Sequence, residues 1–310
     1  MALPAGARLT PRVTVVVLSW NGREDSLACL RSLAAATYPR LGVIVVDNGS
    51  SDGSADAVAS AYPDVVLIRL DANLGFAGGM NVGIAEALSR DAELVMLLNN
   101  DTIVEPGFVE PLVNALEADG DASAACSQIV FRDDPATVWY AGASFRPGRG
   151  HHGSNRGYGR ARIAATTPPF VTDRACGGAM LVPAAAFAEL GDFDESLFAY
   201  AEDTDWSLRS ARAGRRVLVV PGSVVRHAVS AASGGASSPD TLYYGLRNGL
   251  VVAERWAPLG PLRTRLRRGE AVAAHLAQAL RSGRRRAGVR AVYDGWRDLR
   301  AGRLGPRHAA

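Results

Sequence analysis

Lysine is missing from this chain of 310 residues, so all 34 basic residues are arginine. Because alanine and glycine are abundant as well, we attribute the missing lysine to compositional bias of the genome rather than to function. Cysteine is scarce: Cys29, Cys126 and Cys176 are far apart, odd in number and form no CxxC pair. This pattern excludes a disulfide framework and predicts a reducing, cytoplasmic compartment.

Long hydrophobic runs are also missing. No apolar run approaches the roughly 20 residues that a membrane-spanning helix needs. Residues 1–12 have no apolar core of the kind found in signal peptides, so we expect no such peptide. The loop 19–22, which follows the first predicted strand, lacks the G-x-G-x-x-G pattern. This argues against one alternative, a dinucleotide-dependent oxidoreductase.

Charge is unevenly distributed along the chain, although the net charge is only +3. Residues 263–310 hold 13 arginines against three acids, whereas residues 1–262 hold 21 arginines against 28 acids. A basic tail of this kind is expected to face an anionic surface or partner. Nucleic acid is the less favoured partner, because the body of the protein is acidic.

Apolar, β-branched runs alternate with stretches of helical periodicity in the first third of the chain. The predicted strands are 13–18, 43–46, 65–68 and 94–98; the predicted helices are 24–36, one capped by Ser51 or Ser54, and one that follows a Gly-rich loop and ends near Leu88. Such alternation predicts βαβ units and a mostly parallel sheet with helices on both faces.

Polar side chains follow several of these strands. The polar or glycine-rich loops are 47–54, 73–81 and 99–102. They are expected along the carboxyl edge of the sheet, where open α/β sheets bind ligands. One strand ends in Asn99, Asn100 and Asp101, whose oxygens are of the kind that hard divalent cations take. The alternative is an ordinary strand-to-turn junction, because Asn and Asp are common in turns.

The second half of the chain has a less regular pattern. The expected elements are a helix over 106–118, strands over 122–130 and 137–145, a helix over 203–213 closed by Gly214, and strands over 216–220 and 224–227. Asp203 or Thr204 is a candidate N-cap, which is the structural alternative for the acidic cluster there. His151 and His152 lie in a Gly/Arg-rich loop that we expect to be solvated; the alternative is a metal-binding pair.

The C-terminal region is predicted to be helical. A Gly/Ser/Ala linker over 231–239 precedes predicted helices over 241–256, 270–280 and 287–300. The last helix is basic and amphipathic, with Tyr293 and Trp296 on its apolar side. Two interpretations stay open for it: packing against the main domain, and docking on a membrane surface.

Six segments, in order, match a known family. They are VVVLSWNG (15–22), VVDNGSSDGS (45–54), NLGFAGGMNVG (73–83), LLNNDT (97–102), GGAMLVPAAAF (177–187) and GDFDESLFAYAEDTDWSLRSARAG (191–214). Together they resemble the family-2 inverting glycosyltransferases, and most of all the bacterial rhamnosyltransferase-like subgroup. The resemblance covers roughly residues 12–255, which leaves the basic tail outside it.

The resemblance implies a GT-A fold, a nucleotide-sugar donor and a divalent metal, Mg²⁺ or Mn²⁺. We therefore expect a catalytic domain over 1–230, a linker over 231–239, and a helical, basic region over 240–310. Within the catalytic domain, residues 12–105 form the nucleotide-binding half and residues 106–230 the acceptor-binding half.

The resemblance also implies roles for individual residues. Asp203 matches the catalytic base, Asp101 the metal-binding acid, and His227 a further metal ligand. Asp47 resembles the residue that bonds the pyrimidine base. The other expected contacts are Ser19, Asn21, Asn73, Asn81, Asn99 and Asn100 for the sugar donor, and Gly177, Gly178 and Trp206 for the acceptor. Glu202 is expected to be the second catalytic residue, beside Asp203, where it orients acceptor hydroxyls or supports a loop. Trp206 has a second interpretation, as a core aromatic.

The chain departs from the family pattern at two positions. Asn99 stands where the first acid of the metal motif is expected, which predicts weaker metal affinity, and Met80 stands where many members carry an arginine. The chemistry still fits a single displacement with inversion, in which Asp203 accepts the proton of the attacking hydroxyl. The Asn99 departure keeps open the alternative of a non-catalytic nucleotide- or sugar-binding module.

The expected sugar donor is dTDP-rhamnose, with a UDP-hexose or UDP-galactofuranose as the alternative. The expected acceptor is a glycan or a polyprenyl-linked sugar, reached from the cytoplasm by a protein that is peripheral at the inner face of the membrane. These expectations place the protein in cell wall or polysaccharide biosynthesis.

Overall fold

The computed structural model describes residues 10–145, 155–228 and 237–307. His151 and His152 lie outside these ranges, as does most of the expected linker 231–239.

The strands are β1 (Val13–Ser19), β2 (Leu41–Asp47), β3 (Val66–Arg69), β4 (Leu94–Asn99), β5 (Thr102–Val104), β6 (Ala122–Phe131), β7 (Val138–Tyr140), β8 (Phe170–Thr172), β9 (Ala179–Pro183) and β10 (Arg216–His227). The helices are α1 (Arg23–Ala34), α2 (Ser54–Ala61), α3 (Gly75–Ser89), α4 (Val109–Ala118), α5 (Ala184–Leu190), the 3₁₀ turn η2 (Glu195–Leu197), α6 (Glu202–Arg212), α7 (Pro239–Trp256), α8 (Pro261–Arg281) and α9 (Arg285–Arg300).

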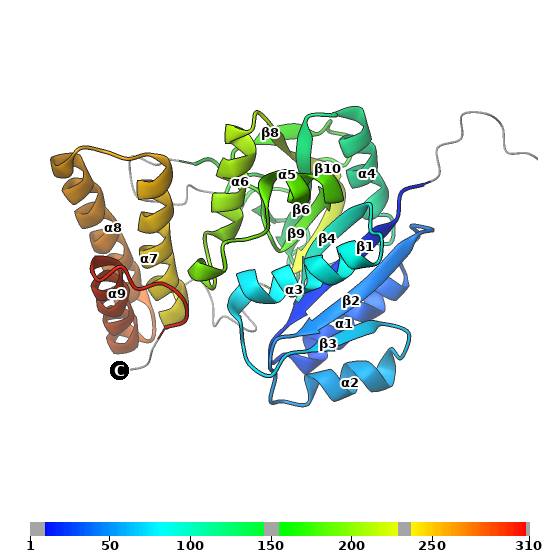
Figure 1. The fold of residues 1–310 in the computed structure, drawn as a ribbon, viewed down its shortest axis with the longest axis horizontal. Coiled ribbons are helices and arrows are strands. Elements are labelled where there is room, and N and C mark those ends of the chain that lie inside the picture. The colour runs from blue at the N-terminus through cyan, green and yellow to red at the C-terminus, as the bar shows by residue number, and fades with distance from the viewer. Residues whose placement is uncertain (1–9, 146–154, 229–236, 308–310) are drawn as a thin grey trace, which may run out of the picture.

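One large sheet forms the centre of the molecule, in the order β3-β2-β1-β4-β9-β6-β10-β5 (Figure 1). The four strands of its first half, β3, β2, β1 and β4, are parallel, as predicted. β1 is buried along its whole length, because helices cover both faces of a parallel sheet. Figure 1 shows α3 in front of this half and α1 behind it. The α/β fold with a mostly parallel sheet is therefore confirmed.

The register of the parallel strands aligns their carboxyl ends. Ser19 at the end of β1 pairs with Asp47 at the end of β2, and Leu18 pairs with Asn99 at the end of β4. β9 then runs antiparallel to β4, with Ala179 opposite Leu98. The segment just before β9 therefore meets the same edge of the sheet as the ends of β1, β2 and β4.

Several local predictions were wrong. Neither Ser51 nor Ser54 caps α2; the cap is Gly53, with φ +79°. Residues 216–227 form one strand, β10, with an irregularity between Val220 and Val224, rather than two strands. The helix α6 begins at Glu202 after Ala201, so neither Asp203 nor Thr204 is its N-cap. Gly214 does close α6, with φ +75°.

The Gly-rich stretch 75–83 is not a loop, because α3 already begins at Gly75. Tertiary packing explains this difference. A Cβ at Gly79 would lie 2.5 Å from Leu18 Cδ1, and one at Gly83 would lie 2.2 Å from Val16 Cγ1. The glycines therefore let α3 lie directly on β1.

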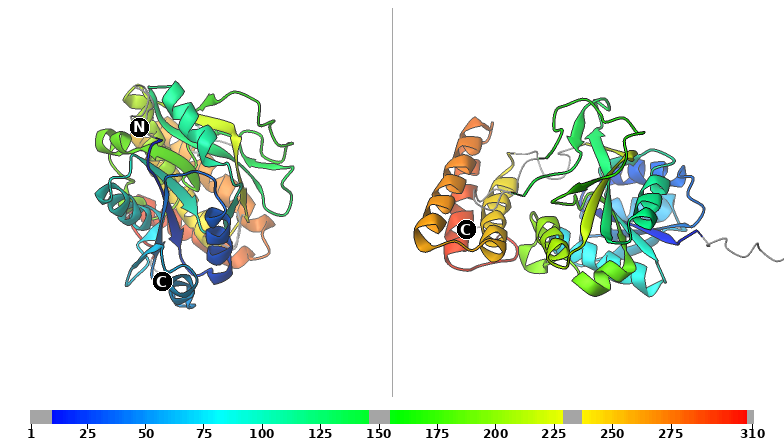
Figure 2. Two further views of the ribbon diagram at one scale, coloured as in Figure 1. Left: turned by 90° about the vertical axis from the view of Figure 1, so that its right-hand side faces the viewer. Right: turned by 90° about the horizontal axis from the view of Figure 1, so that it is seen from above.

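The helices α7, α8 and α9 form a separate layer at one end of the molecule (Figures 1 and 2). They share an apolar cluster that includes Leu242, Leu246, Leu250, Ala271 and Val292. Trp296 and Leu299 of α9 pack against this cluster, so one side of α9 lies against α7 and α8. The cluster also receives Phe198 and Tyr200 from the loop before α6, so the C-terminal helices contact the main domain at that point. In the described ranges, no helix has the length and apolar character that crossing a membrane requires.

Candidate functional site

Asp47 presents an unused carboxylate oxygen at the carboxyl edge of the sheet. Its side chain is buried, and Oδ2 accepts a hydrogen bond from the backbone N–H of Ser50 at 3.2 Å. Its other oxygen, Oδ1, is buried and has no hydrogen-bond partner in the part of the chain that the structure describes. Such an oxygen is costly to leave unpaired. This position therefore fits a ligand that brings a hydrogen-bond donor.

The neighbouring polar residues at this edge differ in how accessible they are. Asn21 Oδ1 accepts from the Ser51 N–H at 2.9 Å, which joins the loop after β1 to the loop after β2. Ser19 is buried and shares a hydrogen bond of 2.9 Å with Ser26 on α1, and Asn100 donates to the same Ser26 hydroxyl at 2.9 Å. Their side chains thus point toward α1, and the predicted sugar-donor contacts of Ser19 and Asn100 would require a local rearrangement.

Asn73 and Asn81 form hydrogen bonds at the start and in the middle of α3. Asn73 Oδ1 accepts from Asn48 Nδ2 at 3.0 Å and from the Gly75 N–H at 2.7 Å. Asn81 Nδ2 donates to Phe193 O and to Glu195 Oε1, both at 2.9 Å, and its oxygen accepts from Phe193 N–H at 3.0 Å. Both amide hydrogens of Asn81 are used. Its predicted contact with the sugar donor therefore has no free N–H to make, and Asn81 instead ties α3 to the loop before η2.

Asp101 and His227 are in direct contact. His227 ends β10, opposite Thr102 of β5, and its Nε2 lies 2.9 Å from Asp101 Oδ1. Its other ring nitrogen, Nδ1, is buried without a hydrogen-bond partner among the described residues. Trp139 of β7 packs edge-on against the imidazole, with ring centroids 4.9 Å apart. A carboxylate and an imidazole nitrogen held this close fit a divalent cation such as Mn²⁺ or Mg²⁺.

Asp203 lies in the first turn of α6 with polar partners on two sides. Its Oδ2 accepts from the Gly177 N–H at 3.4 Å and lies 3.6 Å from Arg174 Nη1. Its Oδ1 accepts from the Thr204 hydroxyl at 3.1 Å. Arg174 is positioned in turn by a 2.6 Å hydrogen bond from its Nη2 to Asn155 Oδ1. Sequence reasoning missed Arg174; its place just before the matched glycines is the signal that could have found it.

Glu202 differs from Asp203 in its environment. It is buried, and its Oε2 has no hydrogen-bond partner in the described ranges. Burial, reinforced by the neighbouring charge of Asp203, raises the pKa of Glu202 to about 8. Glu202 therefore favours its protonated form at neutral pH.

Two glycines bring the sheet edge and α6 together. A Cβ at Gly178 would lie 3.1 Å from Asn99 Nδ2, and one at Gly177 would lie 3.7 Å from Asp203 Cβ. The Gly178 carbonyl also accepts from the Asn99 N–H at 3.1 Å. The structure thus places the matched stretch 99–101 and the matched acid Asp203 on either side of Gly177 and Gly178.

The turn that leads into α6 has a strained backbone. Phe198, Tyr200 and Ala201 have φ values of +65°, +66° and +74°, which L-residues rarely adopt. Asn248 of α7 is fully buried, and its Nδ2 lies 2.7 Å from Leu197 O, 2.7 Å from Ala199 O and 3.0 Å from Tyr200 O. Strain held in place by surrounding contacts concentrates at functional sites. Here it directly precedes Glu202 and Asp203.

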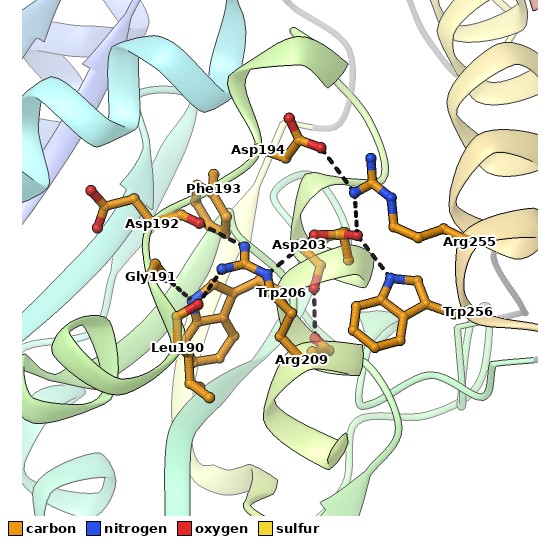
Figure 3. Close-up of polar contacts among 12 residues, drawn as sticks. Leu190, Gly191, Asp192, Phe193, Asp194, Asp203, Trp206, Arg209, Arg255 and Trp256 are labelled. Carbon is orange, nitrogen blue, oxygen red and sulfur yellow. Dashed lines mark hydrogen bonds and ion pairs between the residues drawn. The ribbon is translucent and has the colours of Figure 1, made fainter. Parts of the chain in front are cut away.

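Trp206 is part of the core, so the prediction that it stacks on a sugar is wrong. Its side chain is 0% exposed, contacts Phe187, and donates from Nε1 to Gly191 O at 3.0 Å (Figure 3). The side of α6 that carries Trp206 faces the core because α6 packs against α5 and β10. On the same helix, Asp205 accepts from Arg255 and Trp256 of α7, each at 2.8 Å, which fixes α6 to α7.

The chain matches a family model and several curated proteins. Residues 14–182 match the model for glycosyl transferase family 2. The chain is 28% identical over 305 residues to the N-acetylglucosaminyl-diphospho-decaprenol L-rhamnosyltransferase of Mycobacterium tuberculosis, covering 90% of this chain and 97% of that protein. It is 25% identical over 254 residues to the dTDP-rhamnosyl transferase RfbF of Shigella flexneri, covering 80% of this chain and 81% of the relative.

Solved structures share the fold. GalNAc-T7 with UDP, GalNAc and Mn²⁺ superposes with a TM-score of 0.62 at 19% identity, over 80% of this chain and 48% of that one. The mannosyltransferase PcManGT of Pyrobaculum calidifontis, with GDP-Man and Mn²⁺, superposes with a TM-score of 0.54 at 21% identity, over 94% and 76% of the two chains. Both neighbours have the GT-A fold, which confirms the fold expected here. With more than half of its length matched by the family model, this chain belongs to glycosyl transferase family 2 and is a glycosyltransferase.

Proposed function

We propose that this glycosyltransferase moves a sugar from a nucleotide-sugar donor to a hydroxyl of its acceptor by single displacement with inversion. One observation carries the proposal: Asp203 and Asn99 lie against the adjacent glycines Gly177 and Gly178, and Asp101, two residues after Asn99, contacts His227. A proton acceptor and a place for the leaving diphosphate are the two parts that such a displacement needs.

The sugar donor is proposed to be dTDP-rhamnose. The unpaired Oδ1 of Asp47 supports a pyrimidine base, because thymine and uracil both offer a ring N–H at this kind of contact. The names of the two relatives, both rhamnosyltransferases, favour rhamnose over the alternatives of a UDP-hexose or UDP-galactofuranose. Asn21 and Asn99 remain proposed contacts of the nucleotide.

Asp101 and His227 are proposed to hold the divalent cation, Mg²⁺ or Mn²⁺. When bound, the cation would neutralise charge that develops on the leaving diphosphate. Two side chains do not fill the shell of such an ion, and the described ranges contain no cluster of three or more His, Cys, Asp and Glu side chains. Asn99 stands in place of a second carboxylate, so oxygens of the nucleotide sugar are proposed to complete the shell.

Asp203 is proposed to accept the proton of the attacking hydroxyl. The Gly177 N–H and Arg174 hold its Oδ2, which fixes the carboxylate toward the glycines. Glu202 keeps its own proton at neutral pH and orients the acceptor or the loop rather than acting as the base. Positioning of the two reactants and proton removal together account for the acceleration expected of such a site.

The acceptor is proposed to be a polyprenyl-linked sugar. The mycobacterial relative is named for an N-acetylglucosaminyl-diphospho-decaprenol substrate, and this chain covers nearly all of that protein. We further propose that residues 1–230 are the catalytic domain and that the basic region 240–310 keeps the protein at the inner face of the membrane, in cell wall or polysaccharide synthesis.

A panel of dTDP-, UDP- and GDP-sugars tests this function. Metal-dependent hydrolysis of each nucleotide sugar is measured with Mn²⁺, with Mg²⁺ and with EDTA. We expect dTDP-rhamnose to be turned over fastest and EDTA to abolish the reaction. Turnover of a UDP-sugar above dTDP-rhamnose would replace the proposed sugar donor, and full activity in EDTA would remove the proposed role of Asp101 and His227.

A further inference from the structure

The outer side of α8 and α9 carries an unusual apolar surface. Leu262, Leu266 and Leu280 of α8 are 70%, 60% and 54% exposed, and Tyr293 of α9 is 63% exposed. At 100° per residue, the three leucines fall on one side of α8, and Val289, Tyr293 and Trp296 fall on one side of α9. Large apolar side chains exposed together mark an interaction site rather than ordinary surface.

A groove joins the two helices on this side. It has a volume of about 650 Å³, and its apolar lining is Val272, Ala273, Leu276 and Trp296. Arg265, Arg268 and Arg300 also line it. We call the exposed apolar residues and this groove together the α8–α9 seam. The seam lies on the helices that form the far end of the molecule from α2 and β3 in Figure 1.

The arginines of α8, α9 and the segments next to them include both paired and unpaired side chains. Arg297, Arg303 and Arg307 pair with Asp294 or Asp298, and Arg268 pairs with Glu254. By contrast, a second group of arginines makes no ion pair within the described residues. Its members are Arg263, Arg265, Arg281, Arg284, Arg285, Arg286 and Arg300.

These observations point to one occupant. An apolar seam flanked by unpaired arginines is complementary to the interface of a bilayer, where acyl chains lie beneath anionic headgroups. Glu270 is the one acid of α8, and both acids of α9, Asp294 and Asp298, are buried and paired with arginine. Little negative charge therefore opposes such an approach.

We propose that the α8–α9 seam docks this protein on an anionic membrane surface, with Leu262, Leu266 and Tyr293 entering the interface and the unpaired arginines contacting lipid phosphates. The proposal deepens the proposed function, since a polyprenyl-linked acceptor lies in a membrane, but its test does not require catalysis. If a partner protein, nucleic acid or a second copy of the chain occupied this surface instead, the protein would not bind anionic vesicles in the test below.

Sedimentation of the full chain with vesicles tests the proposal. We expect binding to vesicles that contain phosphatidylglycerol, little binding to phosphatidylcholine vesicles, and loss of binding in about 1 M salt, where the Debye length falls to roughly 3 Å. Equal binding to both kinds of vesicle, or none to either, would overturn it. So would salt-sensitive dimerisation or RNA binding that occurs while anionic vesicles fail to bind.

Matched variants separate the contribution of the arginines near the seam from that of net charge. Changing Arg284, Arg285 and Arg286 together to Gln should weaken vesicle binding by roughly 10- to 100-fold at low salt. The control changes three arginines of the main domain, Arg31, Arg69 and Arg160, to Gln, and it should bind as the parent does. Equal weakening in both triple variants would show that net charge, rather than the seam, decides binding.

The apolar part is tested with Leu262→Gln combined with Leu266→Gln. These side chains are exposed, so the fold should be retained, which the melting temperature checks. We expect weaker binding to anionic vesicles, and unchanged hydrolysis of the nucleotide sugar in solution. Normal vesicle binding by this variant would refute the apolar contact. Vesicle binding by a parent chain that hydrolyses no nucleotide sugar would instead count against the proposed function alone.

Discussion

Asn248 holds the carbonyl of Tyr200 at 3.0 Å, and through this contact a helix of the C-terminal region fixes the strained turn that precedes Asp203. The same amide contacts the carbonyls of Leu197 and Ala199. On the other side of the turn, the Phe198 carbonyl accepts from the Ala77 N–H of α3 at 3.1 Å. The position of Asp203 therefore depends on α3 and α7 together.

Replacing Asn248 should consequently reduce turnover at a distance from the reaction. Asn248→Ala leaves three carbonyls without this partner, and we expect a stability loss of about 2–4 kcal/mol. A shift of the turn should lower kcat by roughly 10- to 100-fold while KM for the nucleotide sugar changes little. Steady-state kinetics and thermal melting measure both effects. Asn114→Ala, at an exposed position of α4, is the control; a kcat equal to the parent's in Asn248→Ala would refute the positioning role.

Asp203→Asn tests the proposed base. The substitution keeps the size of the side chain, so the fold and binding of the nucleotide sugar should persist. Turnover should fall by about 10²–10⁴-fold, because the amide cannot accept the proton. Calorimetric binding of the nucleotide sugar, measured beside kcat, shows that only the chemical step is affected. If Asp203→Asn turned over as fast as the parent, another residue would have to be the base.

Asp101→Asn tests the cation site separately. We expect binding of the nucleotide sugar to lose most of its dependence on Mn²⁺, because an amide is a weaker ligand than a carboxylate. His227→Gln should act in the same direction, since the two side chains are in contact. Titrations of nucleotide binding at several Mn²⁺ concentrations give the measurement. An identical metal response in parent and both variants would show that the cation binds elsewhere.

Glu202 should make stability dependent on pH. Its pKa is about 8 in the folded protein, because of burial and then the charge of Asp203, against 4.5 for the ordinary side chain. Between these values the folded state binds the extra proton, so the free energy of unfolding falls as pH rises from about 4.5 to 8. The limiting slope for one group is about 1.4 kcal/mol per pH unit. Denaturation of the parent and of Glu202→Gln across this range should show a flatter dependence in the variant; parallel curves would contradict the assignment.

Deleting residues 257–310 should lower stability and activity as well as remove the membrane contact. The deletion removes Asp298, which accepts from Tyr243 at 2.7 Å, and Gly305, whose carbonyl accepts from the buried Arg247 at 2.8 Å. It also exposes the apolar cluster of α7. We expect a lower melting temperature and reduced hydrolysis of the nucleotide sugar even without a membrane. A truncated chain that is as stable and active as the parent would show that α7 holds the turn alone.

Local sequence patterns were enough to predict the parallel half of the sheet, the polar residues at its carboxyl edge and the family. The β-branched runs predicted the four parallel strands, because strands buried on both faces need continuous apolar residues. Asn99, Asn100 and Asp101 were expected at the carboxyl edge for the same reason, and the order of the motifs indicated the family. These features depend on residues close together in the chain, so the sequence alone contains them.

Only the tertiary structure decided how distant residues combine. It showed that the pairing of β10 with β5 brings His227 to Asp101, two residues that only the family resemblance had linked. It also assigned Trp206 to the core and showed that the glycines 75–83 belong to a helix packed on β1. It also placed Asn248 beneath the turn before Asp203 and revealed Arg174 at the proposed base. Burial and contact between segments far apart in the chain set these outcomes, and no local pattern of residue types encodes them.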